Sequence, residues 1–380
     1  MIAMTTPSTE LDDILDRVGL KLQLSETAYD EANKRYTAIG DWLGAPASRL
    51  AIYKPDIYPQ GSLRIGTTVK PRGRDEFDLD LVCELQTNPE TFPNPIALLA
   101  LVEGRLREHE TYRSMTERKN RCLRVTYANQ FHLDILPACP SPGPGPYGGH
   151  SVLVPDCDAD DWKPSNPKGY ALWFEDRARE AAKEFKRAFE ALPEQQSYEE
   201  LAILNRVVQL IKRRRDIEFE NTPKFAPISI VLTTLAAQAY RGQPSVSEAM
   251  LAALDGIIIS IPNVAAGRLR VLNPTNAGED LSERWDDNPE AYFAFVKWMN
   301  SFRTDWQELL NVRGIQNVKT VLERMFGERV AKEVVTEHIR FFETPRQSGG
   351  LAVERGTGRI VPVTVAASTP ILRNTFHGDD

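Results

Sequence analysis

The segment Tyr58–Leu85, YPQGSLRIGTTVKPRGRDEFDLDLVCEL, constrains the fold of this chain more than any other part of its sequence. Within it, the run Phe77–Val82 alternates apolar residues with Asp78 and Asp80. Side chains two positions apart on a strand point to the same face of the sheet. The pattern therefore predicts a strand that packs its apolar face on a core and presents both aspartates on the other face.

Two carboxylates side by side repel each other unless a cation lies between them. A third candidate, Asp134, lies in the apolar run His132–Leu136, which reads as a neighbouring strand. Mg²⁺ prefers oxygen ligands, and a metal pair about 3.5–4 Å apart can activate an attacking hydroxyl and stabilise a leaving oxygen. We therefore expect Asp78, Asp80 and Asp134 to bind two Mg²⁺ ions, with Mn²⁺ as an alternative. Without the other motifs, a solvated strand face would be the better explanation of Asp78 and Asp80.

Fifteen residues lie between a glycine-serine pair, Gly61-Ser62, and the first of the carboxylates, Asp78. Glycine lets the backbone approach a phosphate closely, and turn amides that face an anion form a phosphate cradle. Such a pair is common in ordinary turns, so the order of the motifs carries the argument. A Gly-Ser turn followed by carboxylates on neighbouring strands predicts attack of a hydroxyl on the α-phosphorus of a nucleoside triphosphate.

These motifs resemble the signature of the polymerase-β-like nucleotidyltransferase superfamily. Within it, the chain resembles the CD-NTases of bacterial antiphage signalling, relatives of cyclic GMP–AMP synthase and oligoadenylate synthase. Two further segments support the narrower match. They are Trp162–Tyr170, WKPSNPKGY, and Leu210–Asp216, LIKRRRD, which resembles the lysine-bearing helix of that family.

The resemblance implies a role for each site residue. Asp78 and Asp80 would bind both metals, and Asp134 would bind the metal that activates the hydroxyl and would take its proton. The donor triphosphate would be held by Gln60, Gly61, Ser62, Lys212 and Ser229. From the residues alone, Lys212 could equally belong to a basic cluster that interacts with a helix dipole, and Ser229 could simply begin a helix.

The resemblance also implies the product and the partners. We expect an enzyme that condenses NTPs, ATP or GTP or both, into a cyclic di- or trinucleotide. The zinc-binding insertion of the animal synthase is missing, because Cys83, Cys122, Cys139 and Cys157 form no cluster at metal-ligand spacing, so no DNA activator is expected. An accessory regulatory protein could act on the carboxyl-terminal tail.

Two rival functions remain open. A template-free RNA-tailing enzyme would carry a basic or aromatic RNA-binding module, and none is visible. A catalytically silent nucleotide-binding scaffold would be expected to lose a carboxylate, and all three are present. The polar segment Asn273–Asp280 could contact a base, although we favour its capping the next helix.

Composition limits the class of protein. The chain has 380 residues, 42% of them hydrophobic and 26% charged, and a net charge of −7, which argues against a general nucleic-acid binder. It contains no run of eighteen apolar residues and no signal-peptide pattern, so a cytoplasmic enzyme without membrane contact is expected.

The order of the predicted elements favours an α+β fold: a sheet lobe and a helical lobe with the active site in the cleft between them. Residues 1–170 would form the catalytic lobe, beginning with one long helix over 10–43, and the Pro- and Gly-rich residues 137–169 would form a loop at the cleft. Residues 171–342 would form the helical lobe, and 343–380 a tail. The helices expected in that lobe are Leu172–Leu192, Tyr198–Glu218, Ile228–Arg241, Val246–Leu254, Pro289–Leu310 and Val318–Phe342.

Overall fold

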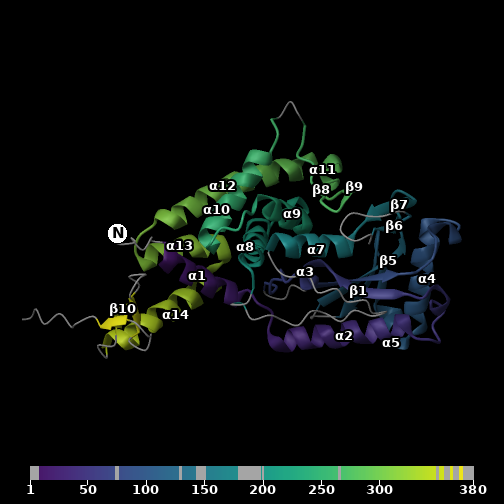
Figure 1. Ribbon diagram of the computed structural model, residues 1–380, viewed down its shortest axis with the longest axis horizontal. Coiled ribbons are helices and arrows are strands. Elements are labelled where there is room, and N and C mark those ends of the chain that lie inside the picture. Colours follow the sequence, from purple (N-terminus) through teal and green to yellow (C-terminus); the bar gives the residue numbers. More distant parts are fainter. Residues whose placement is uncertain are drawn as a thin grey trace, which may run out of the picture.

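The protein is elongated and has a sheet lobe at one end and a helical lobe at the other, as Figure 1 shows. The computed structural model describes residues 8–370 except 73–76, 128–130, 143–150, 179–197, 199–200, 264–266, 348–350, 355–359 and 363–367. This architecture confirms the expected α+β class.

The sheet has the strand order β1-β2-β5-β4-β3, and β6 and β7 extend it from β5. Only the β2–β5 pair is parallel; the other pairs of this sheet are antiparallel. The strands are β1 Asp56–Gln60, β2 Phe77–Glu84, β3 Thr116–Arg118, β4 Leu123–Tyr127, β5 Phe131–Pro140, β6 Val152–Asp156 and β7 Asp161–Ser165. The expectation of a loop over 137–169 was wrong, because the β6–β7 hairpin lies within it, but its expected position at the cleft is confirmed, because Val154, Lys163 and Ser165 line the cavity described below. Val152 and Val154 are buried there, against Tyr58 and Val82.

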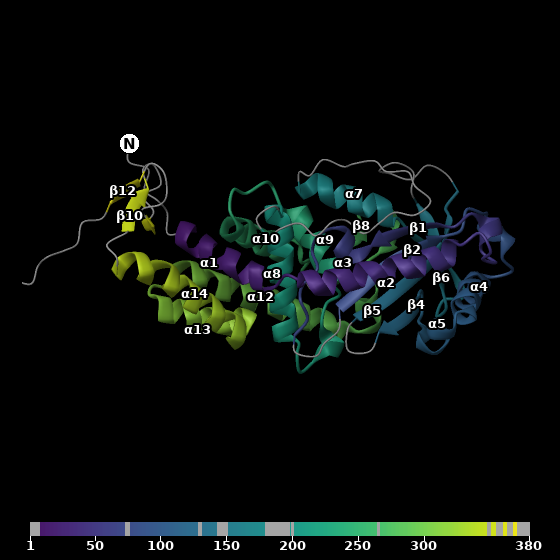
Figure 2. The same ribbon diagram turned by 90° about the horizontal axis from the view of Figure 1, so that it is seen from below.

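One face of the sheet packs against helices α2 Glu26–Gly44, α4 Pro95–Glu108 and α5 Glu110–Met115. Leu79 and Leu81 of β2 are fully buried in this core, together with Leu133 and Ile135 of β5. The alternation read from the sequence thus leaves the opposite face of β2, with its aspartates, toward the helical lobe. Figure 2 shows α2 running along the sheet on the covered face.

The helical lobe is built around a second core. Its largest buried side chains include Trp298, Trp306, Phe295 and Phe302, all on α12. The helices of this lobe are α1 Ser8–Lys21, α7 Pro167–Ala178, α8 Ile203–Glu218, α9 Ser229–Ala239, α10 Val246–Ser260, α11 Arg284–Asp287, α12 Pro289–Asn311, α13 Ile315–Phe326 and α14 Glu328–Gln347. None of the described helices combines the length and apolar character needed to cross a membrane.

The single helix expected over residues 10–43 is in fact two helices. The Ser25 hydroxyl accepts a hydrogen bond from the Ala28 amide and caps a new helix, α2, four residues after α1 ends. Leu15 and Val18 of α1 are buried in the helical core, whereas α2 packs on the sheet. The first helix therefore belongs to the helical lobe.

The helix expected over Val318–Phe342 is also divided. Gly327 has φ +95° and its amide bonds to the Glu323 carbonyl, so the residue ends α13 in the manner of a C-terminal glycine cap. In the tail, Leu351–Glu354, Ile360–Pro362 and Ser368–Pro370 form a small antiparallel sheet. Residues 371–380, where modification was considered, lie outside the described part of the chain.

Candidate active site

A cavity of about 890 Å³ lies between the carboxylate face of the sheet and the helical lobe. Its size is typical of a pocket for a nucleotide-sized ligand. Every predicted site residue except Asp134 lines it. The lining residues among them are Gln60, Gly61, Ser62, Asp78, Asp80, Lys212 and Ser229.

The three predicted carboxylates lie on adjacent parallel strands. Asp80 on β2 is directly paired in register with Asp134 on β5, and Asp78 lies two residues before Asp80 on the same face. The Asp78 side chain is 60% exposed and that of Asp134 only 15%. The strands thus bring together the carboxylates that the sequence singled out, with Asp134 set behind the cavity wall.

Burial and mutual repulsion make this cluster electrostatically costly. Burial, followed by the charges of Asp78 and Asp134, raises the pKa of Asp80 to about 8. Desolvation inside the cavity also raises the pKa of Asp78, even though its side chain is 60% exposed, and the nearby Arg124 charge opposes the shift. Within the described residues, Asp80 forms no ion pair with a lysine or arginine. A cation at this position would therefore remove a large penalty.

Arg124, on β4, is the cation closest to the cluster and was not predicted as a site residue. Its Nε and Nη2 each donate to one carboxylate oxygen of Asp134, both at 2.7 Å. The Nη2 atom also lies 3.6 Å from Oδ1 of Asp78. No three Asp, Glu, His or Cys side chains of the described chain are arranged as a ready metal-binding cluster. The third carboxylate, Asp134, is bound by Arg124.

The glycine-serine turn lies against the aspartates. Gly61 begins the single-turn helix α3, Gly61–Arg64, with φ +67°, and a Cβ added there would lie 2.1 Å from Oδ2 of Asp80. Only glycine allows this approach without strain. The Ser62 hydroxyl accepts a hydrogen bond from Thr68 Oγ1 at 3.1 Å and lines the cavity.

Lys212 is a buried part of the cavity wall. Its ammonium donates to the carbonyl and the hydroxyl of Thr67, both at 3.0 Å, and the residue is only 6% exposed. Burial, reinforced by the charge of Arg215, lowers the pKa of Lys212 to about 7. Lys212 therefore fastens the segment that follows the Gly-Ser turn to α8.

Other polar residues on α8 hold the same segment. Asn205 donates to the Ile65 carbonyl at 2.7 Å, and Gln209 donates to the Thr68 carbonyl at 3.0 Å. Their spacing along α8 puts them on one side of the helix together with Lys212. The helical lobe thus fixes the position of the glycine-serine turn.

Arg215, one helical turn after Lys212, also lines the cavity, beside Ser229. Its Nη1 donates to Ser229 Oγ at 2.7 Å, and its charge lowers the pKa of Asp78. Sequence reasoning chose Lys212 from the cluster LIKRRRD and missed Arg215. The available signal was helical phase, because residues three apart on a helix share a face, and both residues line the cavity.

The far wall of the cavity comes from the antiparallel hairpin β8 Leu272–Asn273 and β9 Asn276–Asp280. This segment was expected to cap a helix, and that preference was wrong. Its Glu279 side chain lines the cavity and accepts hydrogen bonds from Asn273 at 2.7 Å and Ser165 at 3.3 Å.

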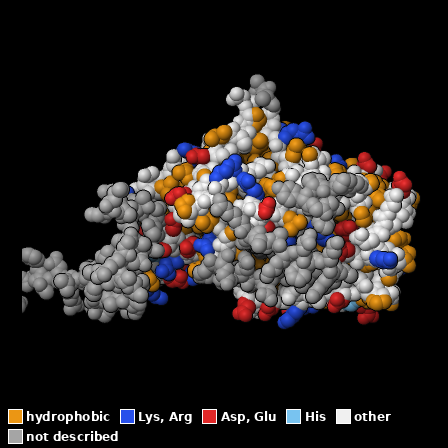
Figure 3. All heavy atoms as spheres, viewed as in Figure 1, with side chains coloured by type: hydrophobic (Ala, Val, Ile, Leu, Met, Phe, Trp, Pro, Cys, Tyr) orange, Lys and Arg blue, Asp and Glu red, His pale blue; other side chains and the backbone are white. Residues whose placement is uncertain are grey.

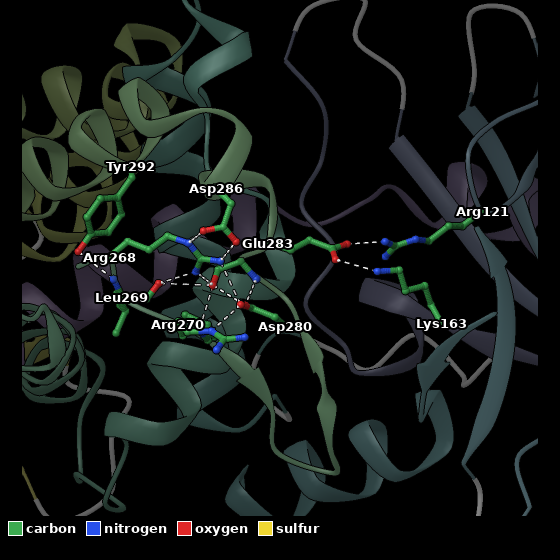
Figure 4. Close-up of polar contacts among 11 residues, drawn as sticks. Arg121, Lys163, Arg268, Leu269, Arg270, Asp280, Glu283, Asp286 and Tyr292 are labelled. Atoms are coloured by element: carbon green, nitrogen blue, oxygen red, sulfur yellow. Dashed lines mark hydrogen bonds and ion pairs between the residues drawn. The ribbon is translucent and has the colours of Figure 1, made fainter. Parts of the chain in front are cut away.

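A second contact crosses the cleft. Figure 4 shows Glu283, from the segment after β9, extending toward Arg121 and Lys163 of the sheet lobe. Arg121 is itself held by Asp156, whose Oδ2 lies 2.6 Å from its Nε. On the other side, Arg268 ties the same segment to its own lobe through Asp280 and Asp286. The two lobes are thus joined at the cleft by ion pairs.

Taken together, these features define a nucleotidyltransferase of the polymerase-β-like class, with paired strand aspartates facing a glycine-serine turn across a two-lobed cleft. Comparison with known proteins supports this class and narrows it. Residues 6–178 match the model of the Second Messenger Oligonucleotide or Dinucleotide Synthetase domain. A c-di-GMP synthase of Roseivirga ehrenbergii is 36% identical over 385 residues, covering all of both chains.

The cyclic dinucleotide synthase CdnG of Bradyrhizobium diazoefficiens is 26% identical and covers 97% of this chain and 95% of its own. The structure of that CD-NTase in complex with GTP has a TM-score of 0.70 at 24% identity, over 87% of this chain and 98% of the other. The chain belongs to the bacterial CD-NTase family of cyclic oligonucleotide synthases.

Proposed function

We propose that this chain is a Mg²⁺-dependent synthase that condenses two GTP molecules into a cyclic dinucleotide. The observation that carries the choice of GTP is the full-length, 36% identity to a c-di-GMP synthase. The cavity supports the proposal, because it combines a phosphate-facing turn, paired carboxylates and an arginine within one cleft.

The residues present fit a divalent metal. Asp80 is a partly buried carboxylate without an ion pair in the described part of the chain, and desolvation, followed by the charges of Asp78 and Asp134, raises its pKa to about 8. Carboxylate oxygens from two adjacent strand positions match the ligand preference of Mg²⁺. When bound, the metal would supply charge stabilisation for the pentavalent α-phosphoryl group and the leaving pyrophosphate. Asp78, Asp80 and Asp134 would hold it.

The chain's own residues would perform the rest of the reaction. The backbone at Gly61 and the Ser62 hydroxyl would orient the donor triphosphate, with Gln60 beside them. Arg215 and Ser229 would bind its outer phosphates from the helical lobe, and Lys212 would keep the turn in place. A ribose hydroxyl of the second nucleotide forms the new P–O bond, the bond to the β-phosphate breaks, and Asp134 takes the hydroxyl proton. A second transfer closes the ring.

The biological setting follows the family. Antiphage signalling, a cytoplasmic location and regulation by an accessory protein at the tail are parts of the same proposal and rest on the family resemblance. On the face seen in Figure 3, acidic and basic side chains of the described residues are interspersed rather than segregated. A nucleic-acid activator would require a clustered basic patch, so the mixed charge on this face favours the binding of a small charged substrate.

The test is incubation of the purified protein with radiolabelled GTP, ATP, CTP and UTP, singly and mixed, followed by phosphatase treatment and separation of the products. GTP alone should give a phosphatase-resistant product and release pyrophosphate. Asp78→Ala combined with Asp80→Ala should abolish both while the protein stays folded. Synthesis retained in that double variant, or no product from any NTP mixture with the wild type, would refute the proposal.

A further inference from the structure

We propose that Arg124 competes with the divalent metal for Asp134, so that the third carboxylate becomes a metal ligand only when the arginine is displaced. This inference rests on the metal-binding part of the proposed function. It assigns a positioning role to a residue that the motifs of the chain do not include.

The sheet register places Arg124 for this role. It lies directly opposite Asp134 in the antiparallel β4–β5 pair, and Asp134 lies directly opposite Asp80 in the parallel β5–β2 pair. Arg124, Asp134 and Asp80 therefore form a row across three strands on the face that the helical lobe covers. Cross-strand neighbours on one face are close enough for their side chains to interact.

The contact uses both oxygens of Asp134. A bidentate arginine-carboxylate pair is among the strongest side-chain interactions, and both donor-acceptor distances here are 2.7 Å. Hydrogen bonds to Asp134 raise the pKa of Arg124 further above its ordinary value, so the guanidinium remains charged. A metal that approaches from the cavity would thus meet Asp78 and Asp80 first. It would reach Asp134 only by displacing Arg124 from that carboxylate.

Charge balance explains why the arginine is there. Three carboxylates on adjacent strands, without a cation, would destabilise the fold. Arg124 offsets the charges of Asp134 and, at 3.6 Å, of Asp78. Asp80 is left without an ion pair among the described residues, and it faces the Gly61 turn. The site is therefore stabilised in part before a metal arrives, at the expense of affinity for the metal alone.

An alternative role for Arg124, support of Asp134 as a metal ligand, predicts the opposite change in metal affinity when the arginine is removed. If Arg124 instead orients Asp134 for the metal, as hydrogen-bond partners behind metal ligands commonly do, its removal should weaken metal binding. If it competes, its removal should strengthen metal binding. The sign of a single affinity change thus separates competition from support.

The experiment measures Mn²⁺ binding to the nucleotide-free, full-length protein by electron paramagnetic resonance of the free ion. Arg124→Gln should bind Mn²⁺ about tenfold more tightly than the wild type, as expected when a strong competing ion pair is removed. Arg124→Lys, which keeps the charge but loses the bidentate geometry, should fall between them. Arg118→Gln is the matched control, because Arg118 pairs with Glu103 at the outer edge of the same sheet and should leave the affinity unchanged.

Equal or weaker Mn²⁺ binding by Arg124→Gln would overturn the proposal, and so would no measurable binding by either protein. Thermal unfolding of each variant identifies any loss of fold, and Arg124→Lys provides a second test if the glutamine variant unfolds. Because binding is measured without turnover, this outcome is independent of whether GTP is converted to a cyclic product.

Discussion

The backbone of Gly61 lies against the carboxylate of Asp80, so that a Cβ at position 61 would be 2.1 Å from Oδ2. The glycine-serine turn and a central acidic group are therefore one structural unit, although nineteen positions separate Gly61 from Asp80 in sequence. The β1–β2 pairing enforces this proximity, because Gln60 is in register with Asp80. Any change in the turn is transmitted directly to the carboxylate.

Gly61→Ala should therefore abolish nucleotide synthesis. The added methyl group must displace the Asp80 carboxylate or the turn, and an alanine at φ +67° is also strained. Gly267→Ala is the matched control, since Gly267 has φ +87° but no heavy atom within 4 Å of an added Cβ. Both variants should lose about 1 kcal/mol of stability from backbone strain. Only Gly61→Ala should lose pyrophosphate release. Full activity in Gly61→Ala would show that the turn adapts.

Lys212 and Arg215, the two α8 cations that line the cavity, should separate into a structural and a ligand-binding residue. Arg215→Gln should lower kcat/KM for NTP by about 10- to 100-fold, the loss expected for a charge-assisted hydrogen bond to phosphate, with little change in Tm. Lys212→Met should instead lower stability by roughly 1–3 kcal/mol, because the buried carbonyl of Thr67 loses its donor. Thermal unfolding and steady-state kinetics on both variants test this. Equal Tm with a larger kinetic loss in Lys212→Met would reverse the assignment.

Much of the site could be predicted because strand alternation is a local property. Asp78 and Asp80 share a face for the same reason that Leu79 and Leu81 are buried, and that pattern is visible in the sequence. The two-lobed α+β architecture followed from the order of strands and helices. The register between Asp80 and Asp134 is non-local, and only the order of the motifs indicated it.

The features that the sequence did not predict have a common physical origin. Arg124 bonds to Asp134 on another strand and Arg215 to Ser229 on another helix, and a basic residue on a strand or in the cluster LIKRRRD carries no local mark of such a contact. The division between α1 and α2 was missed because both helices have an apolar stripe, and only the fold shows that the stripes enter different cores. Ser25 was the available cap signal.

The raised pKa of Asp80 predicts a stability effect that depends on pH. Since its folded-state pKa is about 8, against 3.8 for the free side chain, the folded protein binds more protons than the unfolded chain between these values. Stability contributed by this group therefore falls as pH rises from about 4 to 8. In metal-free buffer, Asp80→Asn should be more stable than the wild type above pH 8, by roughly 1–3 kcal/mol. The difference should shrink toward pH 4. Denaturant unfolding at several pH values measures it, and a pH-independent difference would contradict this origin.

Glu283 should control how tightly the lobes close over the nucleotide. It contacts Arg121 and Lys163 of the sheet lobe, while Arg268 anchors its own segment. Glu283→Gln keeps the shape of the side chain but removes the charge that joins the lobes, so amide hydrogen exchange should increase in β7 and in the β8–β9 hairpin. KM for GTP should rise about three- to tenfold, the range for losing one partly exposed ion pair with two cations.

Asp286→Asn is the matched control for this prediction, because Asp286 pairs with Arg268 within the helical lobe and makes no ion pair across the cleft among the described residues. It removes a charge from the same segment without removing the contact between lobes. If both variants change KM and hydrogen exchange equally, the effect is a loss of local charge rather than of lobe closure. A rise in KM confined to Glu283→Gln would identify the interlobe ion pairs as its cause. High salt screens these pairs in the wild type, so the difference in KM between the wild type and Glu283→Gln should then shrink.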